Sequence, residues 1–359
     1  MSEFGSSIDS RENVEERDSK ISIARSTSSA LFQWATGLQS EGTGRVILCQ
    51  TSDLLAEVDR LAGQQDVVLA LAEQGLAERR LPSGALVLPF EGQLVEQGDT
   101  IHIGRGYEVE LQDYLAIPFV PVTRPTIVRL SSFVNWEAFV ADADEAQATG
   151  AFIPQMTSSS VVLADRSVLD AVIDQVDVSI NRLTVDQAGA VHYWPDAPSV
   201  APIAEFASEP EMQPTSAYFA NVGGEETEQL IRERPWLRRY LAALRIAGQQ
   251  GGDTWSVSGF GRTLAGADFD RGARTTGEIL IWRDDEYQLV VTDSGRRFNL
   301  GRDTAVVIES LLETESLDAA IARITAAGLA RQGLERDLAD LQRRFAGAGV
   351  VLGPETLVG

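Results

Sequence analysis

Apolar positions follow two different spacings over residues 28–195 of the chain. The run Arg45–Cys49 is typical of a short buried strand, and the apolar residues of 54–61 fall on one helical face after the capping candidates Thr51 and Ser52. Further β-rich runs occur at 85–90, 100–103, 107–111 and 126–130, and a helix is expected to begin after Ser131 or Ser132. The pattern predicts a mixed α/β domain of unassigned fold over residues 28–195.

The segments around this domain have a different composition. Residues 1–27 contain almost no large apolar side chain, which predicts a disordered tail because ordering could not be offset by burial. Five prolines between Pro195 and Pro214 indicate an extended linker or docking arm. A helix is predicted to begin near Pro235, and eight glycines between Gly248 and Gly277 indicate a flexible joint. We therefore expect residues 196–277 to be a Pro-rich linker, a helix and a Gly-rich joint.

Three strands followed by three helices are predicted for residues 278–353. The β-rich runs are Glu278–Trp282, Tyr287–Thr292 and Arg296–Leu300. In the third run the alternation places Phe298 and Leu300 on one face, and Arg297 and Asn299 on the other. Apolar spacing then predicts helices over Thr304–Leu312, Leu317–Ile324 (capped by Ser316) and Gln332–Phe345. This order is that of a winged helix-turn-helix, so the whole chain is expected to be an α+β protein.

Residues 278–352, about a fifth of the chain, resemble the PqqD-like recognition elements of RiPP pathways, which make ribosomally synthesised and modified peptides. Within that family, the Arg-rich, Lys-poor composition and the C-terminal position of the module look most like the recognition proteins of daptide antibiotic biosynthesis. The resemblance implies that the module binds the leader of a precursor peptide as an extra strand, in the cleft between its third strand and third helix. It further implies presentation of that precursor to separate tailoring enzymes.

The resemblance implies a peptide-binding site on Arg296–Leu300 and the facing helix. The implied site residues are Arg296, Arg297, Phe298, Asn299, Leu300, Arg336, Leu338, Leu341, Arg343, Arg344 and Phe345. The five arginines would give the cleft a cationic edge that selects an acidic leader, or they are ordinary solvated surface groups. Arg323 is placed outside the cleft, and residues 278–359 are expected to bind the leader on their own.

Charge argues against polyanion partners. The chain has 30 basic and 53 acidic residues, a net charge of −23, and residues 278–352 carry 13 acidic against 9 basic side chains. Acidic residues on the third helix would repel phosphates in the major groove. We expect no nucleic-acid partner, although a winged-helix transcriptional regulator stays open as an alternative.

Residue usage excludes several kinds of chemistry. The only lysine is Lys20, so a phosphate-binding loop with a conserved lysine cannot form, and a Schiff-base lysine could lie only in the tail. The only cysteine, Cys49, lies in an apolar run, and neither His102 nor His192 has partners at metal-ligand spacing. We therefore predict no catalytic residue, no metal and no cofactor. An enzyme with an unrecognised site in residues 28–195 stays open.

No secretion signal or long apolar stretch is visible. The chain is accordingly expected to be cytoplasmic and to have no membrane partner.

Overall fold

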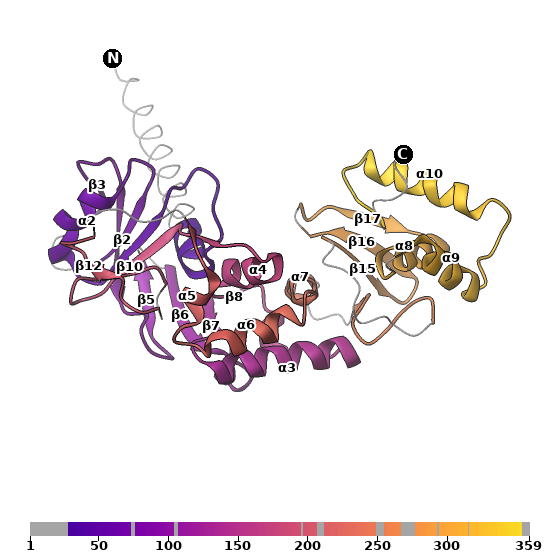
Figure 1. The fold of residues 1–359 in the computed structure, drawn as a ribbon, viewed down its shortest axis with the longest axis horizontal. Helices are drawn as coiled ribbons and strands as arrows, with labels where there is room; N and C mark the ends of the chain where they lie inside the picture. The colour runs from indigo at the N-terminus through magenta and orange to yellow at the C-terminus, as the bar shows by residue number, and fades with distance from the viewer. Residues whose placement is uncertain are drawn as a thin grey trace, which may run out of the picture. The chain divides into compact units, whose positions relative to one another are not determined.

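The computed structural model shows two compact units in the chain (Figure 1). It describes residues 28–72, 76–103, 107–194, 197–206, 212–248, 255–266, 277–292, 294–314 and 316–353. Unit 1 contains residues up to Asn135 together with Ser160–Glu228, and unit 2 contains Trp136–Ser159 together with the chain from Gln229 onward. The expected tail at 1–27 and most of the expected Gly-rich joint lie outside the described residues.

Unit 1 is built on a large mixed sheet. Its strands are β1 (Val46–Cys49), β2 (Val67–Leu71), β3 (Arg79–Arg80), β4 (Leu86–Gly92), β5 (Thr100–Ile103), β6 (Tyr107–Asp113), β7 (Thr126–Arg129), β8 (Val161–Leu163), β10 (Arg182–Val185), β11 (Ala190–His192) and β12 (Ala201–Pro202). Their order is β12-β11-β10-β1-β2-β4-β5-β6-β7-β8, with β3 beside β4. The central strands β10, β1, β2 and β4 are parallel, and β1 is buried along its whole length, as expected for a parallel strand covered on both faces.

Helices and short turns complete unit 1. They are a helix at 28–36, η1 (Ser52–Leu54), α2 (Leu55–Leu61), η2 (Tyr114–Phe119), the start of α3 (Phe133–Thr149), α4 (Arg166–Asp174), α5 (Thr215–Phe219) and most of α6 (Gly224–Arg232). A small second sheet pairs β9 (Val178–Ser179) with β13 (Met212–Gln213). The Thr51 side chain accepts a hydrogen bond from the Asp53 N–H, which confirms the predicted start of the first helical segment after β1.

A buried charge pair fixes the centre of unit 1. The Arg182 guanidinium donates to a carboxylate oxygen of Asp165 and to the Ala35 carbonyl (2.8 Å), and both charged side chains are almost completely buried. Asp165 has a left-handed backbone conformation (φ 55°) and also accepts a hydrogen bond from the Tyr218 hydroxyl (2.7 Å). A buried carboxylate with two strong donors is compensated for its loss of hydration.

Unit 2 contains a four-stranded antiparallel sheet and the predicted C-terminal helices. The strands are β14 (Ser256–Val257), β15 (Glu278–Arg283), β16 (Glu286–Val291) and β17 (Arg297–Leu300), in that order across the sheet. The helices that follow are α8 (Arg302–Leu312), α9 (Leu317–Ala326) and α10 (Leu334–Ala346). Ser316 caps α9 as predicted, by accepting from the Ala319 N–H (3.2 Å). Leu289 of β16 and Phe298 of β17 pair across the sheet and pack against these helices.

Helix α7 (Leu237–Gly248) and the segment 136–159, which includes η3 (Gln155–Thr157), also belong to unit 2. Tyr240 of α7 lies between Phe139 and Phe152, with ring centroids 5.7 and 6.1 Å apart, and Phe260 lies 5.3 Å from Phe152. α7 also contacts β15. Residues 136–159 were expected in the N-terminal domain, but their contacts place them in the C-terminal unit, where Phe139 and Phe152 pack against Tyr240.

The segment 196–277 differs from the expected linker and joint. β12 pairs with β11 at the edge of the large sheet, and β14 pairs with β15, so this segment supplies strands to both units. Pro202 is compatible with β12 because the outer side of an edge strand needs no ladder donor. The predicted helix near Pro235 is confirmed as α7.

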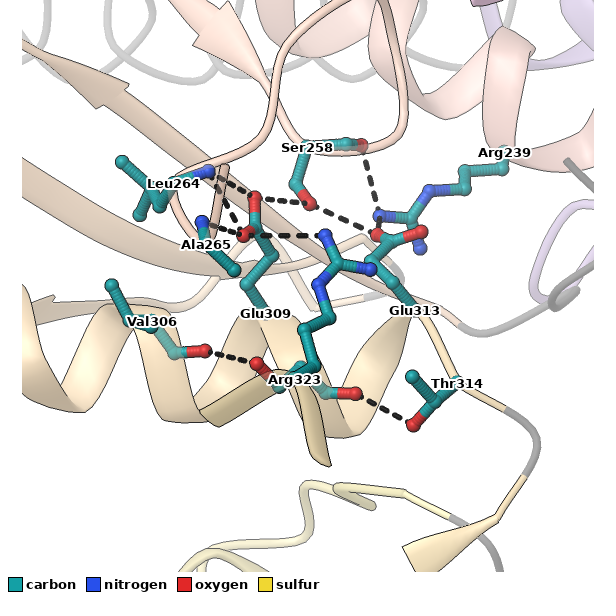
Figure 2. Close-up of polar contacts among 10 residues, drawn as sticks. Arg239, Ser258, Leu264, Ala265, Val306, Glu309, Glu313, Thr314 and Arg323 are labelled. Atoms are coloured by element: carbon teal, nitrogen blue, oxygen red, sulfur yellow. Dashed lines mark hydrogen bonds and ion pairs between the residues drawn. The ribbon is translucent and has the colours of Figure 1, made fainter. Parts of the chain in front are cut away.

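A buried ionic network joins the elements of unit 2 (Figure 2). Arg239 of α7 pairs with Glu313 at the end of α8, and Arg323 of α9 lies 3.5 Å from Glu309 of α8. The Ser258 hydroxyl lies 2.9 Å from Glu313 Oε1 and 3.3 Å from Glu309 Oε1. All four charged side chains are more than nine-tenths buried. Arg323 was expected outside the cleft, and it does lie on α9 and not on α10. Its side chain is buried in the core of the unit, however, and is not a surface charge.

Two further donors complete the network. The N–H groups of Leu264 and Ala265 both donate to the Glu309 carboxylate, at 2.9 and 3.0 Å. The loop that follows β14 is thereby attached to α8. Because a buried charge without its partners is costly, residues 258–265 and α7 are structural requirements of the C-terminal module.

Candidate functional site

Strand β17 is an edge strand in the part of the sheet that the structure describes. Just before it, Gly295 (φ 67°) donates its N–H to the Val291 carbonyl (2.8 Å), and the Val291 N–H donates to the Arg296 carbonyl (2.9 Å). Two residues opposite one are a β-bulge, and glycine suits its left-handed position. The bulge sets the register in which Phe298 faces Leu289.

This register decides which main-chain groups point out of the sheet. Since the Arg296 carbonyl is directed at β16, alternation directs the main chain of Phe298 and Leu300 at β16 as well. The N–H and C=O groups of Arg297 and Asn299 point the opposite way, toward the outer side of the edge. Asn299 therefore offers a donor and an acceptor to any strand that is added there.

One end of the space between β17 and α10 is closed. Figure 1 shows α10 alongside β17, and Phe298 meets Phe345 edge to face with ring centroids 5.4 Å apart. The Arg296 guanidinium lies 5.5 Å from the Phe298 ring centre and donates to the Ala348 carbonyl just after α10. These contacts hold the C-terminal end of α10 against the start of β17.

A pocket opens near the other end of α10. It has a volume of about 350 Å³ and lies between the start of α8, the loop before α10 and the first half of α10. Its aliphatic lining is Val307, Leu329, Ala330, Leu334, Leu338 and Leu341, and its polar lining is Asp303, Thr304, Arg331 and Asp337. Because Asp303 follows Leu300 by three residues, the pocket lies next to the C-terminal end of β17.

The arginines expected at the cleft do not form one cationic surface. Arg343 pairs with Asp340 one turn earlier on α10 (2.6 Å), and Arg336 lies 3.8 Å from Asp337. Arg297 lies on the face opposite Phe298, where its guanidinium is 3.4 Å from the Gln288 side-chain oxygen. Arg344 is exposed on α10. Of the five arginines, Arg296 is the one that contacts both Phe298 of β17 and the Ala348 carbonyl just after α10.

The structure brings together only part of the residue set predicted from the sequence. Arg296, Phe298 and Phe345 form the closed end, whereas Leu338 and Leu341 line the pocket. The sequence did not identify Asp303 and Asp337 as site residues. Val307 and Leu334 lie in the predicted helices 304–312 and 332–345, and helical spacing alone does not distinguish a core position from a pocket wall.

Unit 1 contains a second, smaller pocket of about 80 Å³. It lies at the carboxyl ends of β1, β2 and β4, where ligands of α/β sheets commonly bind. Gln50, Gln93 and Gln187 are its polar lining residues, and none of the described lining residues is titratable. This lining supplies no acid, base or nucleophile.

The remaining chemical candidates lie in structural settings. The Cys49 thiol is buried and donates to the Thr51 carbonyl (2.9 Å), and burial raises its pKa, so it is a poor nucleophile. The His192 ring nitrogens lie 2.9 Å from the Ala197 carbonyl and 3.3 Å from Asp186. His102 is exposed on β5. Among the described residues no group of three potential ligands could hold a metal ion.

Comparison with known proteins gives no relative. No family model, no curated protein and no solved structure matches the chain. Among the helices that the structure describes, none has the length and apolar character needed to cross a membrane.

Proposed function

We propose that this chain binds the leader segment of a ribosomally synthesised precursor peptide along β17 and presents the precursor to separate modifying enzymes. The observation that carries the proposal is the outer side of β17, where Asn299 directs its main-chain groups outward beside α10 and an apolar pocket. The strand and helix order β15–β17, α8–α10 fits a PqqD-like winged helix-turn-helix, in which an added strand would lie between the third strand and the third helix.

Main-chain pairing alone would give weak binding. Arg297 and Asn299 together direct two N–H and two C=O groups outward, and each hydrogen bond contributes about 0.5–1.5 kcal/mol net. Association costs at least ~4 kcal/mol in lost freedom. Side chains of the added segment must supply the difference, and the pocket at the start of α10 provides apolar area for them.

The proposed role needs no catalytic group. Holding one end of a precursor raises the concentration of its other end at bound enzymes to about the millimolar range. A leader-binding protein can therefore speed modification without chemistry of its own. The partners in this proposal are the precursor leader and the tailoring enzymes of the same pathway.

A DNA-binding role fits the same elements less well. α10 would be the recognition helix, but Glu335, Asp337 and Asp340 lie along it, and Asp337 and Asp340 are already paired with arginines. The carboxylates would repel DNA phosphates, and the pairing leaves few cations to attract them. A band-shift assay on duplex DNA at physiological salt should show no complex.

The experiment is a titration of the full chain with the N-terminal halves of short peptides encoded next to its gene. Asn299→Pro removes the outward N–H, whereas Asn299→Ala removes the side chain and keeps that N–H. Binding should fall by about tenfold or more in the proline variant and by less than about twofold in the alanine variant. Circular dichroism checks that both variants are folded. Equal binding by wild type and a folded Asn299→Pro protein would overturn the proposal.

A further inference from the structure

An aromatic side chain of α10 lies against the edge strand β17. The Phe345 ring meets the Phe298 ring edge to face, with ring centroids 5.4 Å apart. On its inner side Phe298 already has a cross-strand neighbour, Leu289 of β16. In Figure 1, α10 lies on the side of β17 that faces away from β16. Phe345 therefore lies on the side of Phe298 where an added strand would run.

Phe345 is held in this position by the chain that follows it. The Val350 N–H donates to the Phe345 carbonyl (2.9 Å), so the chain folds back onto the last turn of α10. Val350 and Leu352 are then buried in the core of the module. The Arg296 guanidinium donates to the Ala348 carbonyl in the same segment. Because moving Phe345 away from β17 would pull Val350 out of the core, its ring is a fixed wall.

The main-chain pattern of β17 makes the place beside Phe298 narrow. The N–H and C=O groups of Phe298 point toward β16, whereas those of Arg297 and Asn299 point outward. In antiparallel addition, the residue beside Phe298 would form a non-hydrogen-bonded pair with it, in which the Cα atoms are about 4.5 Å apart. The two side chains of such a pair lie on one face and touch. On that face the Phe345 ring already contacts Phe298.

We infer that Phe345 is a specificity-determining residue that restricts the added strand to glycine or alanine at the position beside Phe298. The inference rests on the proposed function, since it concerns which segments can be added to β17. A glycine brings no side chain to this position, and the Phe345 ring would cover its main chain, as aromatic side chains do for glycines at sheet edges. A β-branched or larger side chain would overlap the ring. The ligand class is thus an extended segment with one small residue.

The test uses two capped nonapeptides that differ only at the central residue. They are Lys-Thr-Val-Thr-Gly-Thr-Val-Thr-Lys and the same peptide with Val for the Gly, and the terminal lysines keep both soluble. Each is titrated into the full chain, and NMR follows the amide signals of Arg297 and Asn299. Without a wall the valine peptide should bind about two- to fivefold more tightly, because glycine loses more freedom in a strand. With the wall the glycine peptide should bind about threefold or more tightly than the valine peptide.

Two variants on the same helix test the source of this preference. Phe345→Ala should reverse the order, because it removes the ring and leaves the outward main-chain groups of β17 in place. Leu341→Ala is the control, since it shortens another half-buried side chain one turn earlier and keeps the ring. It should keep the preference for glycine. Circular dichroism checks that both variants are folded, and the wild-type comparison decides the matter even if Phe345→Ala is not.

The outcomes separate this inference from the proposed function. If wild type binds the valine peptide as tightly as the glycine peptide, and both shift the Arg297 and Asn299 amides, strand addition stands and the role of Phe345 is wrong. A glycine preference that persists in folded Phe345→Ala would also overturn that role. If neither peptide shifts these amides at millimolar concentration, in wild type or in Phe345→Ala, both proposals fail for this site.

Discussion

Arg239 in α7 and Glu313 at the end of α8 form an ion pair that is almost completely removed from solvent. Arg239 also donates to the main-chain carbonyl of Ser258 (3.0 Å). The pair connects the end of α8 to an element more than 70 residues earlier in the sequence. The stability of the candidate peptide-binding module therefore depends on residues outside it.

Replacement of Arg239 should strongly destabilise unit 2. In Arg239→Met the apolar volume is largely kept, but Glu313 loses its buried counter-charge, which should cost about 3–5 kcal/mol. Arg343→Met is the control, because its pair with Asp340 is exposed and should contribute no more than ~0.5 kcal/mol. Urea denaturation of both variants measures the difference. Similar midpoints for the two would contradict a structural role for the buried pair.

The fragment 278–359 should not fold independently. It lacks Arg239, Ser258, Leu264 and Ala265, so Glu309 and Glu313 would lose their partners other than Arg323. This replaces the expectation that the fragment binds on its own. Circular dichroism should show no cooperative thermal transition for it, whereas the full chain should show one. A cooperative transition in the fragment would mean that the network is dispensable.

Glu309 should make unit 2 more stable as the pH falls. Burial raises the pKa of its carboxyl, against the opposing effect of the Leu264 and Ala265 N–H groups. A raised folded-state pKa means that protonation favours the folded state, so this contribution is complete below the ordinary value of about 4.5 and is lost as the pH rises through the raised value.

The measurement is the unfolding free energy of wild type and of Glu309→Gln between pH 7 and pH 4.5. The pH-dependent contributions of all other carboxyl groups are common to both proteins and cancel when the two unfolding free energies are subtracted. Wild type minus variant should increase on acidification, since only the wild type can gain the proton. A difference that stays flat or decreases would show that Glu309 is not harder to ionise in the folded chain.

Tyr218→Phe should destabilise unit 1 by about 1.5–3 kcal/mol, because the buried Asp165 carboxylate loses a donor at 2.7 Å. Tyr107→Phe serves as the comparison. Its hydroxyl lies 3.2 Å from the neutral Ser28 hydroxyl in a partly exposed position, so the cost should be below ~1 kcal/mol. Denaturant unfolding of the two variants gives both values. Equal costs would contradict a larger contribution from the buried Tyr218–Asp165 hydrogen bond.

The C-terminal strands and helices were predictable because each carries its own local signal. The alternation around Phe298 and Leu300 and the cap at Ser316 are confirmed in the structure. β14 was not predicted, because two residues are too short to show a period. The burial of Arg323 could not be predicted either. Its partner Glu309 lies on another helix, and an ion pair between two helices has no characteristic spacing in the sequence.

The candidate site could likewise be predicted only in part. The strand edge follows from the order of the strands, but which main-chain groups point outward depends on the bulge at Gly295. The pocket depends on the distance between α8 and α10, and that distance is set by packing. Asp303 and Asp337 therefore looked like any acidic residues at a helix start.

Helix α3 begins in one compact unit and continues into the other, so unit 2 is assembled from two separate stretches of chain. On the ribosome, Phe152 emerges 88 residues before its partner Tyr240, a delay of roughly 4–18 s at ~5–20 residues per second. During that interval unit 1 can complete its own sheet while the aromatic side chains of 136–159 wait in solvent. The newly made protein would then pass through a stage in which unit 1 is folded while the aromatic side chains of residues 136–159 are still exposed. Exposed apolar side chains favour aggregation, so the need for chaperones would be greatest at that stage.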